Sequence, residues 1–434
     1  MSSHAEVFLW GSPIGAVSLR DGDGTASFEY DPAFARSGIE VAPLAMPLAG
    51  PRIFRFPALS RQSFSGLPGM LADALPDRFG NALIDAWLAT RGEDPDDFDA
   101  VRRLCYLGQR GMGALEFKPA RGPRPSTSHM LDVESLAELA AEVLAQRDDL
   151  TTSLSRKREA MREILRVGTS AGGARAKALI ALDPDTEEVR SGQAQAESRF
   201  EYWILKFDGV EDRSRDLGTG RGYGAVEWAY SELAKLAGIE MTECRLLEEG
   251  GRRHFMTKRF DREEGGGKIH MQSLAALAHL DFEQAEANSY EQAFQVIDRL
   301  GLPRAARVEQ FRRMTFNVVA RNQDDHVKNI AFLMDRRGEW SLSPAYDVVY
   351  AFNPRGRQTW RHQMSLNGKR DEFTIEDLRL AGRVASLKRS QADDILGQVV
   401  DAVAAWPRIA AEAGLDEARV ERIARDHRLD IPRG

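Results

Sequence analysis

The secondary-structure pattern of the chain changes near residue 270, and this change limits the possible folds more than any other feature. Before it, short apolar segments such as residues 178–182 and 202–207 are typical of β-strands. After it, apolar residues recur at helical spacing, as in residues 303–320 and 390–405. A strand-rich part followed by a helix-rich part predicts an α+β fold with two lobes, and a cleft between such lobes commonly binds a ligand.

Composition and charge exclude several classes of protein. With 43% hydrophobic and 29% charged residues, the 434-residue chain is neither fully disordered nor collagen-like. Its 59 basic and 66 acidic side chains give a net charge of −7, which argues against binding nucleic acid through overall charge. Two cysteines, Cys105 and Cys244, give no disulfide framework, so we expect a reducing cytoplasm. We find no signal peptide and no apolar run of about 18 residues, so we expect no membrane association.

A stretch rich in Pro, Gly and Ser over residues 120–128 marks the clearest domain boundary. It separates a first unit over residues 1–122, which begins with a hairpin-like pair of strands, from the rest of the chain. We predict that a second strand-rich unit spans residues 130–262 and that a mostly helical lobe spans residues 263–434.

The strongest functional signal is the segment 321–329, which follows the apolar end of a predicted helix. Asp324 and Asn329 are five residues apart, as are the Asp and Asn of the protein-kinase catalytic loop. A carboxylate can accept the proton of an attacking hydroxyl, and a downstream amide oxygen can ligate Mg²⁺. The spacing therefore favours phosphoryl transfer. The alternative is that Asp324 and Asp325 form a solvated turn and that Asn329 caps a neighbouring element.

A second carboxylate for a metal ion is available at Asp347. The segments 330–334 and 340–342 predict a hairpin, which would carry Asp347 back beside Asn329. This arrangement mirrors the metal-binding Asp of kinases, although no Asp-Phe-Gly is present. A transition-metal site made by Asp324, His326 and Asp347 is an alternative that lacks a second His or a Cys.

Two further features suit phosphate binding. Lys206 lies inside an apolar strand, where a lysine is costly unless it is paired, and Glu227 is a candidate partner. The alternative is an edge position from which Lys206 reaches water. The glycine-rich segment 167–177 can bring backbone N–H groups close to phosphate, although it is equally consistent with a turn before a strand. It is not a Walker A loop, because Ala174 stands where lysine is required.

Together these residues resemble the HipA family of bacterial serine/threonine kinase toxins from type II toxin–antitoxin systems. Residues 64–77 and 111–115 resemble the N-terminal domain of the family. Residues 258–262 resemble its nucleotide hinge, and residues 324–329 with 346–347 resemble its catalytic core. The resemblance covers nearly the whole chain. It implies a two-lobed, protein-kinase-like fold.

In that fold, residues 1–122 would be the HipA N-terminal subdomain. Residues 130–262 would be the kinase N-lobe with its phosphate loop and hinge, and residues 263–434 the helical C-lobe with the catalytic and Mg²⁺-binding residues. Ser170 matches the position where family members autophosphorylate, and phosphate there would eject the loop and switch the kinase off. Lys258 departs from the acidic residue expected at its hinge position, so a backbone contact to adenine would survive but a side-chain contact would not.

The resemblance also implies cofactors and residue roles. ATP and Mg²⁺ would be the cofactors, Asp324 the general base, and Asn329 and Asp347 the Mg²⁺ ligands. Lys206 and His326 would contact the phosphates. The full set of implied ATP-binding residues is Gly172, Gly173, Ala174, Arg175, Ala176, Lys177, Lys206, Lys258, Arg259, Phe260, His326, Val327, Lys328, Asn329, Tyr346 and Asp347.

Family members phosphorylate an aminoacyl-tRNA synthetase. They are neutralised by a small helix-turn-helix antitoxin, HipB, and the complex represses its own operon. The resemblance therefore implies a HipB-like antitoxin, operator DNA contacted mainly through that antitoxin, and a synthetase as substrate. Two alternatives stay open: a small-molecule kinase, and a degenerate kinase that acts only as a co-repressor with its antitoxin. The intact set Lys206, Asp324, Asn329 and Asp347 argues against degeneracy.

Overall fold

The computed structural model places most of the chain. It describes residues 3–20, 22–122, 130–145, 164–165, 167–168, 175–193, 197–210, 221–356 and 358–431. Of the predicted site residues, Ser170, Gly172, Gly173 and Ala174 lie outside the described residues, as does most of the predicted boundary stretch.

The N-terminal part is built on a five-stranded antiparallel sheet with the strand order β4-β3-β2-β1-β5. Its strands are β1 Ser3–Leu9, β2 Ser12–Leu19, β3 Ser27–Tyr30, β4 Ile53–Phe54 and β5 Leu115–Lys118. Every second residue of β1 is buried, and Val7 and Leu9 thereby reach the core. The predicted hairpin at the start of the chain is confirmed.

Four helices lie between β4 and β5 in the sequence. They are α1 Arg61–Phe64, α2 Gly69–Ala72, α3 Arg78–Thr90 and α4 Ala100–Leu107, with a 3₁₀ turn at Pro95–Asp97, and another 3₁₀ turn at Phe34–Arg36 precedes β4. Asp77 begins α3 and accepts a hydrogen bond from the Gly80 N–H at 2.6 Å, and Asp99 begins α4 in the same way with the Arg102 N–H at 2.9 Å. Both aspartates are thus helix N-caps, which fixes where each helix starts.

A second five-stranded antiparallel sheet has the order β7-β6-β8-β10-β9. Its elements and the neighbouring helices are β6 Lys177–Leu182, β7 Val189–Ser191, β8 Glu201–Lys206, β9 Cys244–Glu249, β10 Arg252–Lys258, α5 Val133–Ala145 and α7 Tyr223–Leu236. All six residues of β6 are buried, since helices α3 and α5 share one hydrophobic core with this sheet. Although α3 precedes the predicted boundary at residue 122, it therefore packs with the second unit.

The C-terminal part is mostly helical, as predicted, but it also holds a three-stranded sheet with the order β11-β12-β13. Its elements are β11 His270–Ser273, α8 Leu274–Ala278, a 3₁₀ turn at Ala285–Ala287, α9 Tyr290–Arg299, α10 Arg304–Ala320, β12 Ala331–Met334, β13 Trp340–Leu342, α11 Ile375–Val384, α12 Arg389–Ala404, α13 Trp406–Glu412 and α14 Glu417–Asp426. The hairpin β12–β13 was predicted, whereas β11 was not. Helix α10 lies in the largest hydrophobic core, to which Phe311 and Phe316 contribute.

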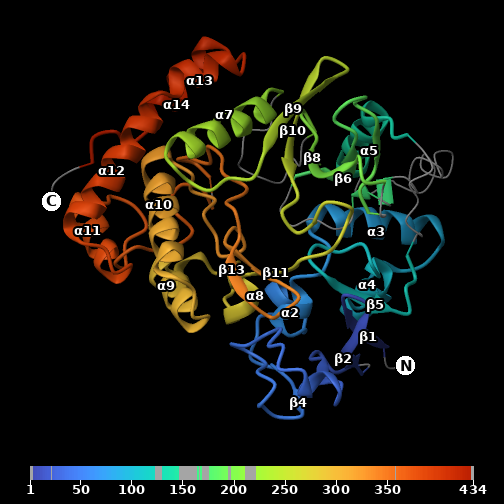
Figure 1. The fold of residues 1–434 in the computed structure, drawn as a ribbon. Helices are drawn as coiled ribbons and strands as arrows, with labels where there is room; N and C mark the ends of the chain where they lie inside the picture. Colours follow the sequence, from blue (N-terminus) through green and yellow to red (C-terminus); the bar gives the residue numbers. More distant parts are fainter. Residues whose placement is uncertain are drawn as a thin grey trace.

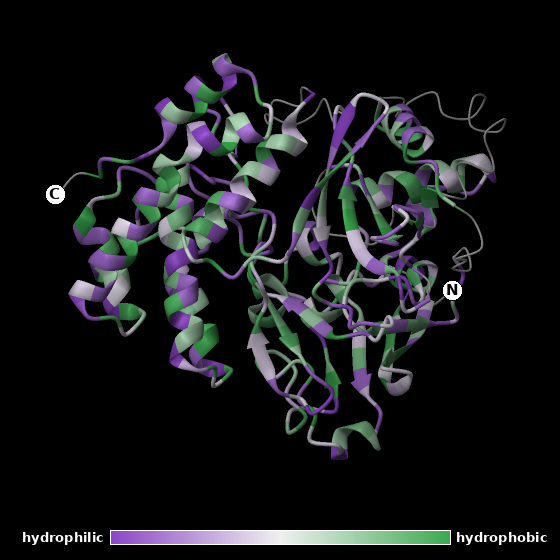
Figure 2. Ribbon diagram, turned by 45° about the horizontal axis from the view of Figure 1, so that its top comes forward, coloured by the Kyte–Doolittle hydropathy of each residue, from purple (hydrophilic) through white to green (hydrophobic). Residues whose placement is uncertain are grey.

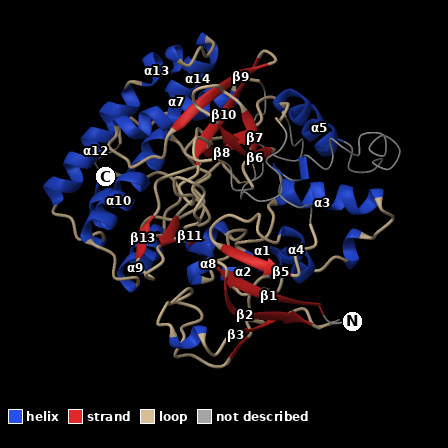
Figure 3. Cartoon of the chain, turned by 45° about the vertical axis from the view of Figure 1, so that its right-hand side comes forward, coloured by secondary structure: helices blue, strands red, loops and turns tan. Residues whose placement is uncertain are grey.

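The pictures show how these parts are arranged. The orange and red helices lie on one side of the molecule and the blue and green strand-rich parts on the other (Figure 1). The strands gather in three groups (Figure 3), one for each sheet. Many helices carry both hydrophobic and hydrophilic residues (Figure 2), as expected of helices that pack on a core by one face. Within the described residues, we find no helix long and apolar enough to span a bilayer.

Candidate active site

The catalytic-loop candidate begins where helix α10 ends. Arg321 adopts the left-handed conformation with φ +59° and closes the helix through its N–H to the Asn317 carbonyl. The chain then turns back on itself, because the Asn329 N–H donates to the His326 carbonyl at 2.8 Å. The Asn329 side chain donates from Nδ2 to the Asp324 carbonyl, also at 2.8 Å. The two residues predicted to form one constellation therefore lie in one tight loop.

A charged cluster joins the second sheet to the C-terminal part. The ammonium of Lys206, at the end of β8, forms ion pairs with Glu227 of α7 and with Asp347 Oδ1, the latter at 2.5 Å. The predicted pair of Lys206 and Glu227 is thus present, and Lys206 does not lie at a sheet edge, since β8 pairs with β6 and β10. The side chains are 11%, 2% and 27% exposed, respectively, so only Lys206 and Asp347 have appreciable access to solvent.

Electrostatics favours the charged forms of Lys206 and Asp347, whereas burial raises the pKa of Glu227. Burial alone would lower the pKa of Lys206, but the carboxylates of Asp347 and Glu227 raise it above its ordinary value. Burial alone would likewise raise the pKa of Asp347, but Lys206 holds it well below its usual range, with help from Lys177 and His326. Asp347 also has φ +56°, a conformation that non-glycine residues adopt rarely and that clusters at functional sites.

The hairpin β12–β13 brings Asp347 to the catalytic-loop candidate, as predicted. Tyr346 donates from its hydroxyl to the Lys328 carbonyl at 2.5 Å, which fixes the preceding residue to the loop. A pocket is lined jointly by His326, Asn329, Tyr346 and Asp347. His326 Nε2 lies 3.9 Å from Asp324 Oδ1. Residues from two sequence motifs thus meet at one pocket.

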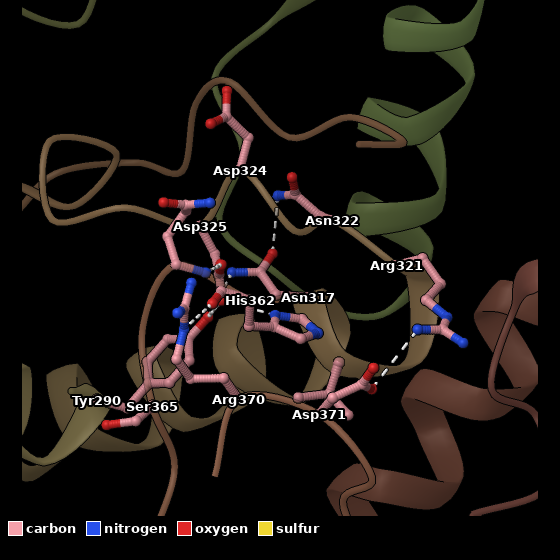
Figure 4. Close-up of polar contacts among 12 residues, drawn as sticks. Tyr290, Asn317, Arg321, Asn322, Asp324, Asp325, His362, Ser365, Arg370 and Asp371 are labelled. Carbon is pink, nitrogen blue, oxygen red and sulfur yellow. Dashed lines mark hydrogen bonds and ion pairs between the residues drawn. The ribbon is translucent and has the colours of Figure 1, made fainter. Parts of the chain in front are cut away.

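Asp325 plays a different part from Asp324. Its carboxylate is buried and accepts hydrogen bonds from the Tyr290 hydroxyl at 2.6 Å, His362 Nδ1 at 2.8 Å and the Gln363 N–H at 2.7 Å. Figure 4 shows this network, from which Asp324 points away. The alternative prediction that Asp325 lies in a solvated turn is therefore wrong. The sequence offered no signal for its role, because its partners lie 35 to 38 residues away.

The residues could hold Mg²⁺. Because Asn329 uses its Nδ2 in the loop, its amide presents Oδ1 to other partners, and Asp347 uses only Oδ1 on Lys206. Mg²⁺ is commonly bound by one or two such protein oxygens together with substrate phosphates and water. In the part of the chain that the structure describes, no group of three or more His, Cys, Asp and Glu side chains could hold a metal ion. The transition-metal alternative therefore finds no support.

The described residues of the predicted phosphate loop, Arg175, Ala176 and Lys177, lie close to the cluster of Lys206. Lys177, the first residue of β6, pairs in register with Lys206 and forms a buried ion pair with Asp77, Nζ to Oδ2, at 3.0 Å. Ala176 is buried, and the Arg175 guanidinium lies 3.1 Å from the ring centre of Tyr223. Asp77, in the N-terminal part, was not predicted as a neighbour, since nothing in the sequence links it to residue 177.

The other catalytic-loop candidates are held by their surroundings. Val327 is buried, and its carbonyl accepts a hydrogen bond from the Ala275 N–H at 3.1 Å. The Lys328 ammonium lies 4.3 Å from the ring centre of Phe282. Phe260 contacts Tyr346, with 5.5 Å between ring centres. Phe260, from the predicted hinge, thus lies beside the residue that precedes Asp347.

The side chains of Lys258 and Arg259 are engaged within the protein. Lys258 Nζ lies 2.5 Å from Glu201 Oε1. Arg259 is buried and donates to both carboxylate oxygens of Asp261, at 2.9 and 2.8 Å, while its backbone N–H donates to the Tyr202 carbonyl at 2.8 Å. Both side chains thus have partners within the protein, and the prediction that backbone groups of this segment line an adenine site stays a prediction.

Comparison with known proteins decides the family. Residues 5–118 match the HipA N-terminal domain, and residues 169–407, more than half of the chain, match the HipA-like C-terminal domain. The chain belongs to the HipA family. A search of curated proteins gave no match.

Comparison with solved structures bears on the fold. The chain is similar to HipA of Shewanella oneidensis MR-1 in its complex with HipB and operator DNA, with a TM-score of 0.66 and 18% identity over 97% of this chain and 94% of that chain. This similarity confirms the predicted two-lobed, kinase-like α+β fold. The proinflammatory kinase CtkA of Helicobacter pylori matches with a TM-score of 0.33 and 12% identity over 52% of this chain and 84% of that chain.

Proposed function

We propose that this HipA-family protein is an ATP- and Mg²⁺-dependent serine/threonine protein kinase. The observation that carries the proposal is the Lys206 ammonium held between Glu227 and Asp347 beside the loop that joins Asp324 to Asn329. A lysine on a sheet, a helix glutamate, a loop aspartate and a downstream metal-binding pair are the parts that kinases use for phosphoryl transfer.

Each residue has a chemical task in this proposal. Lys206 binds the phosphates of ATP, and Glu227 keeps its ammonium oriented. Asp324 accepts the proton of the substrate hydroxyl as the hydroxyl oxygen attacks the γ-phosphorus. The bond between the γ-phosphorus and the bridging oxygen breaks, and ADP leaves. Mg²⁺, held by Asn329 and Asp347 when bound, would supply charge neutralisation for the phosphates.

The proposed biological role is that of the toxin in a type II toxin–antitoxin system in the cytoplasm. A HipB-like helix-turn-helix antitoxin would neutralise it, and the pair would repress its operon by binding operator DNA. The protein substrate would be a translation component, with an aminoacyl-tRNA synthetase as the first candidate. Ser170 would be the site of inactivating autophosphorylation. The HipA complex with HipB and operator DNA supports this proposal by analogy.

Labelled ATP tests the activity. The purified chain is incubated with Mg²⁺, γ-labelled ATP and a bacterial lysate, and we expect label on protein, including Ser170 of the chain itself. Asp324→Asn should abolish the label, whereas Asp394→Asn, on the exposed surface of α12, should leave it unchanged. Label on a small molecule would indicate a small-molecule kinase. No label at all would favour a co-repressor without catalysis.

Cell experiments test the role. We expect that expression of the wild-type chain arrests growth, that Asp324→Gln does not, and that phosphoproteomics finds a synthetase modified only with the wild type. Arrest that persists undiminished with Asp324→Gln would point to another mechanism of toxicity.

A further inference from the structure

The segment that joins helices α1 and α3 in the N-terminal part packs directly on the C-terminal part. Helix α2 lies beside α8 in two views (Figures 1 and 3). The Gly69 N–H donates to His279 Nε2 at 3.0 Å. A Cβ at Gly69 would lie 2.3 Å from the Ala276 carbonyl oxygen, so only glycine fits at this position.

Asp73, just after α2, holds the start of α8. Its two carboxylate oxygens accept hydrogen bonds from the Ser273 N–H and the Ser273 hydroxyl, both at 2.7 Å. The next two amides bind the catalytic-loop candidate and the residue after it: the Ala275 N–H donates to the Val327 carbonyl at 3.1 Å, and the Leu274 N–H to the Ile330 carbonyl at 2.7 Å. Asp73 thus fixes the residue from which α8 supports that loop.

Asp77, four residues later, holds the other lobe. Its carboxylate pairs with Lys177 of β6 at 3.0 Å, and the side chains are only 5% and 3% exposed. Lys177 sits opposite Lys206 in the sheet. Asp77 therefore sets the position of a lysine at the phosphate side of the proposed site.

We propose that Asp73 and Asp77 are positioning residues through which the N-terminal subdomain clamps the two lobes and so sets the geometry of the nucleotide site. Asp73 acts on the catalytic loop through Ser273, and Asp77 acts on the phosphate side through Lys177. This inference rests on the proposed kinase function. Because each carboxylate supports a different part of the site, we expect substitution of Asp77 to change the ATP requirement and substitution of Asp73 to change the maximal rate.

Steady-state kinetics in the full-length chain tests the clamp. Asp77→Asn should raise the ATP concentration for half-maximal autophosphorylation roughly tenfold and change the maximal rate by less than about twofold. Asp73→Asn should lower the maximal rate roughly tenfold with little change in the ATP requirement. Asp99→Asn is the matched control, because Asp99 is also an N-cap in the same subdomain but binds Ser3 and Arg102, not a lobe. Asn preserves an N-cap in both variants, but Asp77→Asn also leaves the buried Lys177 beside a neutral group, so it should unfold at a lower temperature than Asp99→Asn, and the kinetics are compared at a temperature where all variants are folded.

Amide hydrogen exchange separates this inference from the proposed function. In Asp73→Asn, the Leu274 and Ala275 amides should exchange at least tenfold faster than in the wild type, whether or not the protein transfers phosphate. Faster exchange in Asp73→Asn, together with a wild-type chain that transfers no phosphate, would overturn the proposed function and retain the link from Asp73 to the loop. Unchanged exchange, or kinetics for both variants equal to those of Asp99→Asn, would overturn the clamp.

Discussion

Two clusters of three charged side chains lie close to the second sheet, and they differ in what surrounds them. In the cluster of Lys206, Glu227 and Asp347, two members keep some access to solvent, and Asp347 lines a pocket. In the cluster of Arg259, Asp261 and Arg262, the side chains are 0%, 0% and 7% exposed. The first is open and carries a formal charge of one minus. The second is sealed and carries a formal charge of one plus.

The sealed cluster is a joint. Besides both arginines, Asp261 accepts a hydrogen bond from the Gly113 N–H at 2.7 Å. Arg262 returns hydrogen bonds to the Gly111 and Gly113 carbonyls, both at 3.2 Å. The cluster thereby ties the N-terminal subdomain to the connection between β10 and β11. The comparison shows that buried charge alone does not identify an active site, whereas a cluster of net negative charge in which Asp347 lines a pocket suits a cation and a phosphate.

The largest expected effect is on the open cluster. Asp347→Asn should reduce phosphate transfer roughly 10³-fold, because the amide cannot supply the charge that complements the metal and Lys206. The unfolding temperature should change little, since Lys206 keeps its ion pair with Glu227. Transfer of labelled phosphate and thermal unfolding measure both quantities. Activity within tenfold of the wild type would contradict the assignment of Asp347 to the active site.

The next effect is on the sealed cluster. Asp261→Asn leaves two arginines buried beside a neutral group, and we expect the free energy of unfolding to fall by about 3–5 kcal/mol. Urea denaturation measures this loss, and the ATP requirement of the folded protein should stay unchanged. A variant of wild-type stability, or one that is stable but cannot use ATP, would contradict the assignment of this cluster as a joint.

Acid should act on neutral histidines before it protonates Asp347 or Asp261. The pKa values of Asp347 and Asp261 lie below their usual range because of Lys206 and the arginines, despite burial, so both stay ionised at pH 5. Burial lowers the pKa of His279 to about 4, whereas an unfolded histidine titrates near 6.5. The unfolded state then binds more protons, so stability falls as the pH drops from about 6.5 towards 4.

His279→Gln isolates this contribution. The variant removes the titration and keeps a side-chain acceptor for the Gly69 N–H. Between pH 7 and pH 5, the free energy of unfolding measured by urea denaturation should fall in both proteins. The fall should be smaller in the variant than in the wild type, by up to about 2 kcal/mol. Equal losses in both proteins would show that His279 is not held neutral at the contact of α2 with α8.

The smallest effect is expected at an exposed pair. Asp393 binds Arg379 through two hydrogen bonds at 2.8 and 3.0 Å, but both side chains are partly open to water. Asp393→Asn should therefore cost less than about 1 kcal/mol of unfolding free energy. A loss as large as that of Asp261→Asn would show that the exposure of a charge pair does not predict how much the pair stabilises this fold.

Local patterns predicted the parts of the fold and site that lie close together in sequence. Strand β8, helix α10 and the hairpin β12–β13 follow directly from apolar spacing, and the hairpin explains why Asp347 returns to the loop of Asn329. The contacts of Asp73 with Ser273 and of Asp77 with Lys177 could not be read in this way. They join residues 200 and 100 positions apart, and periodicity carries no information about such pairs.

The neighbouring residues Asp324 and Asp325 show the same limit on a smaller scale. Both are acidic and adjacent, and no local pattern indicates that Asp325 is buried. The structure separates them, because Tyr290 and His362, from α9 and from the segment before α11, seal Asp325 while Asp324 points away. The site assignments of Asp324, Asn329 and Asp347 to ATP chemistry stay predictions.

A crystal structure of the chain with Mg²⁺ and a non-hydrolysable ATP analogue tests the central claim most directly. The account predicts a metal ion bound by Asn329 and Asp347, phosphates on Lys206, and Asp324 facing the γ-phosphate. A nucleotide bound away from Lys206, or a metal ion that avoids both Asn329 and Asp347, would contradict it.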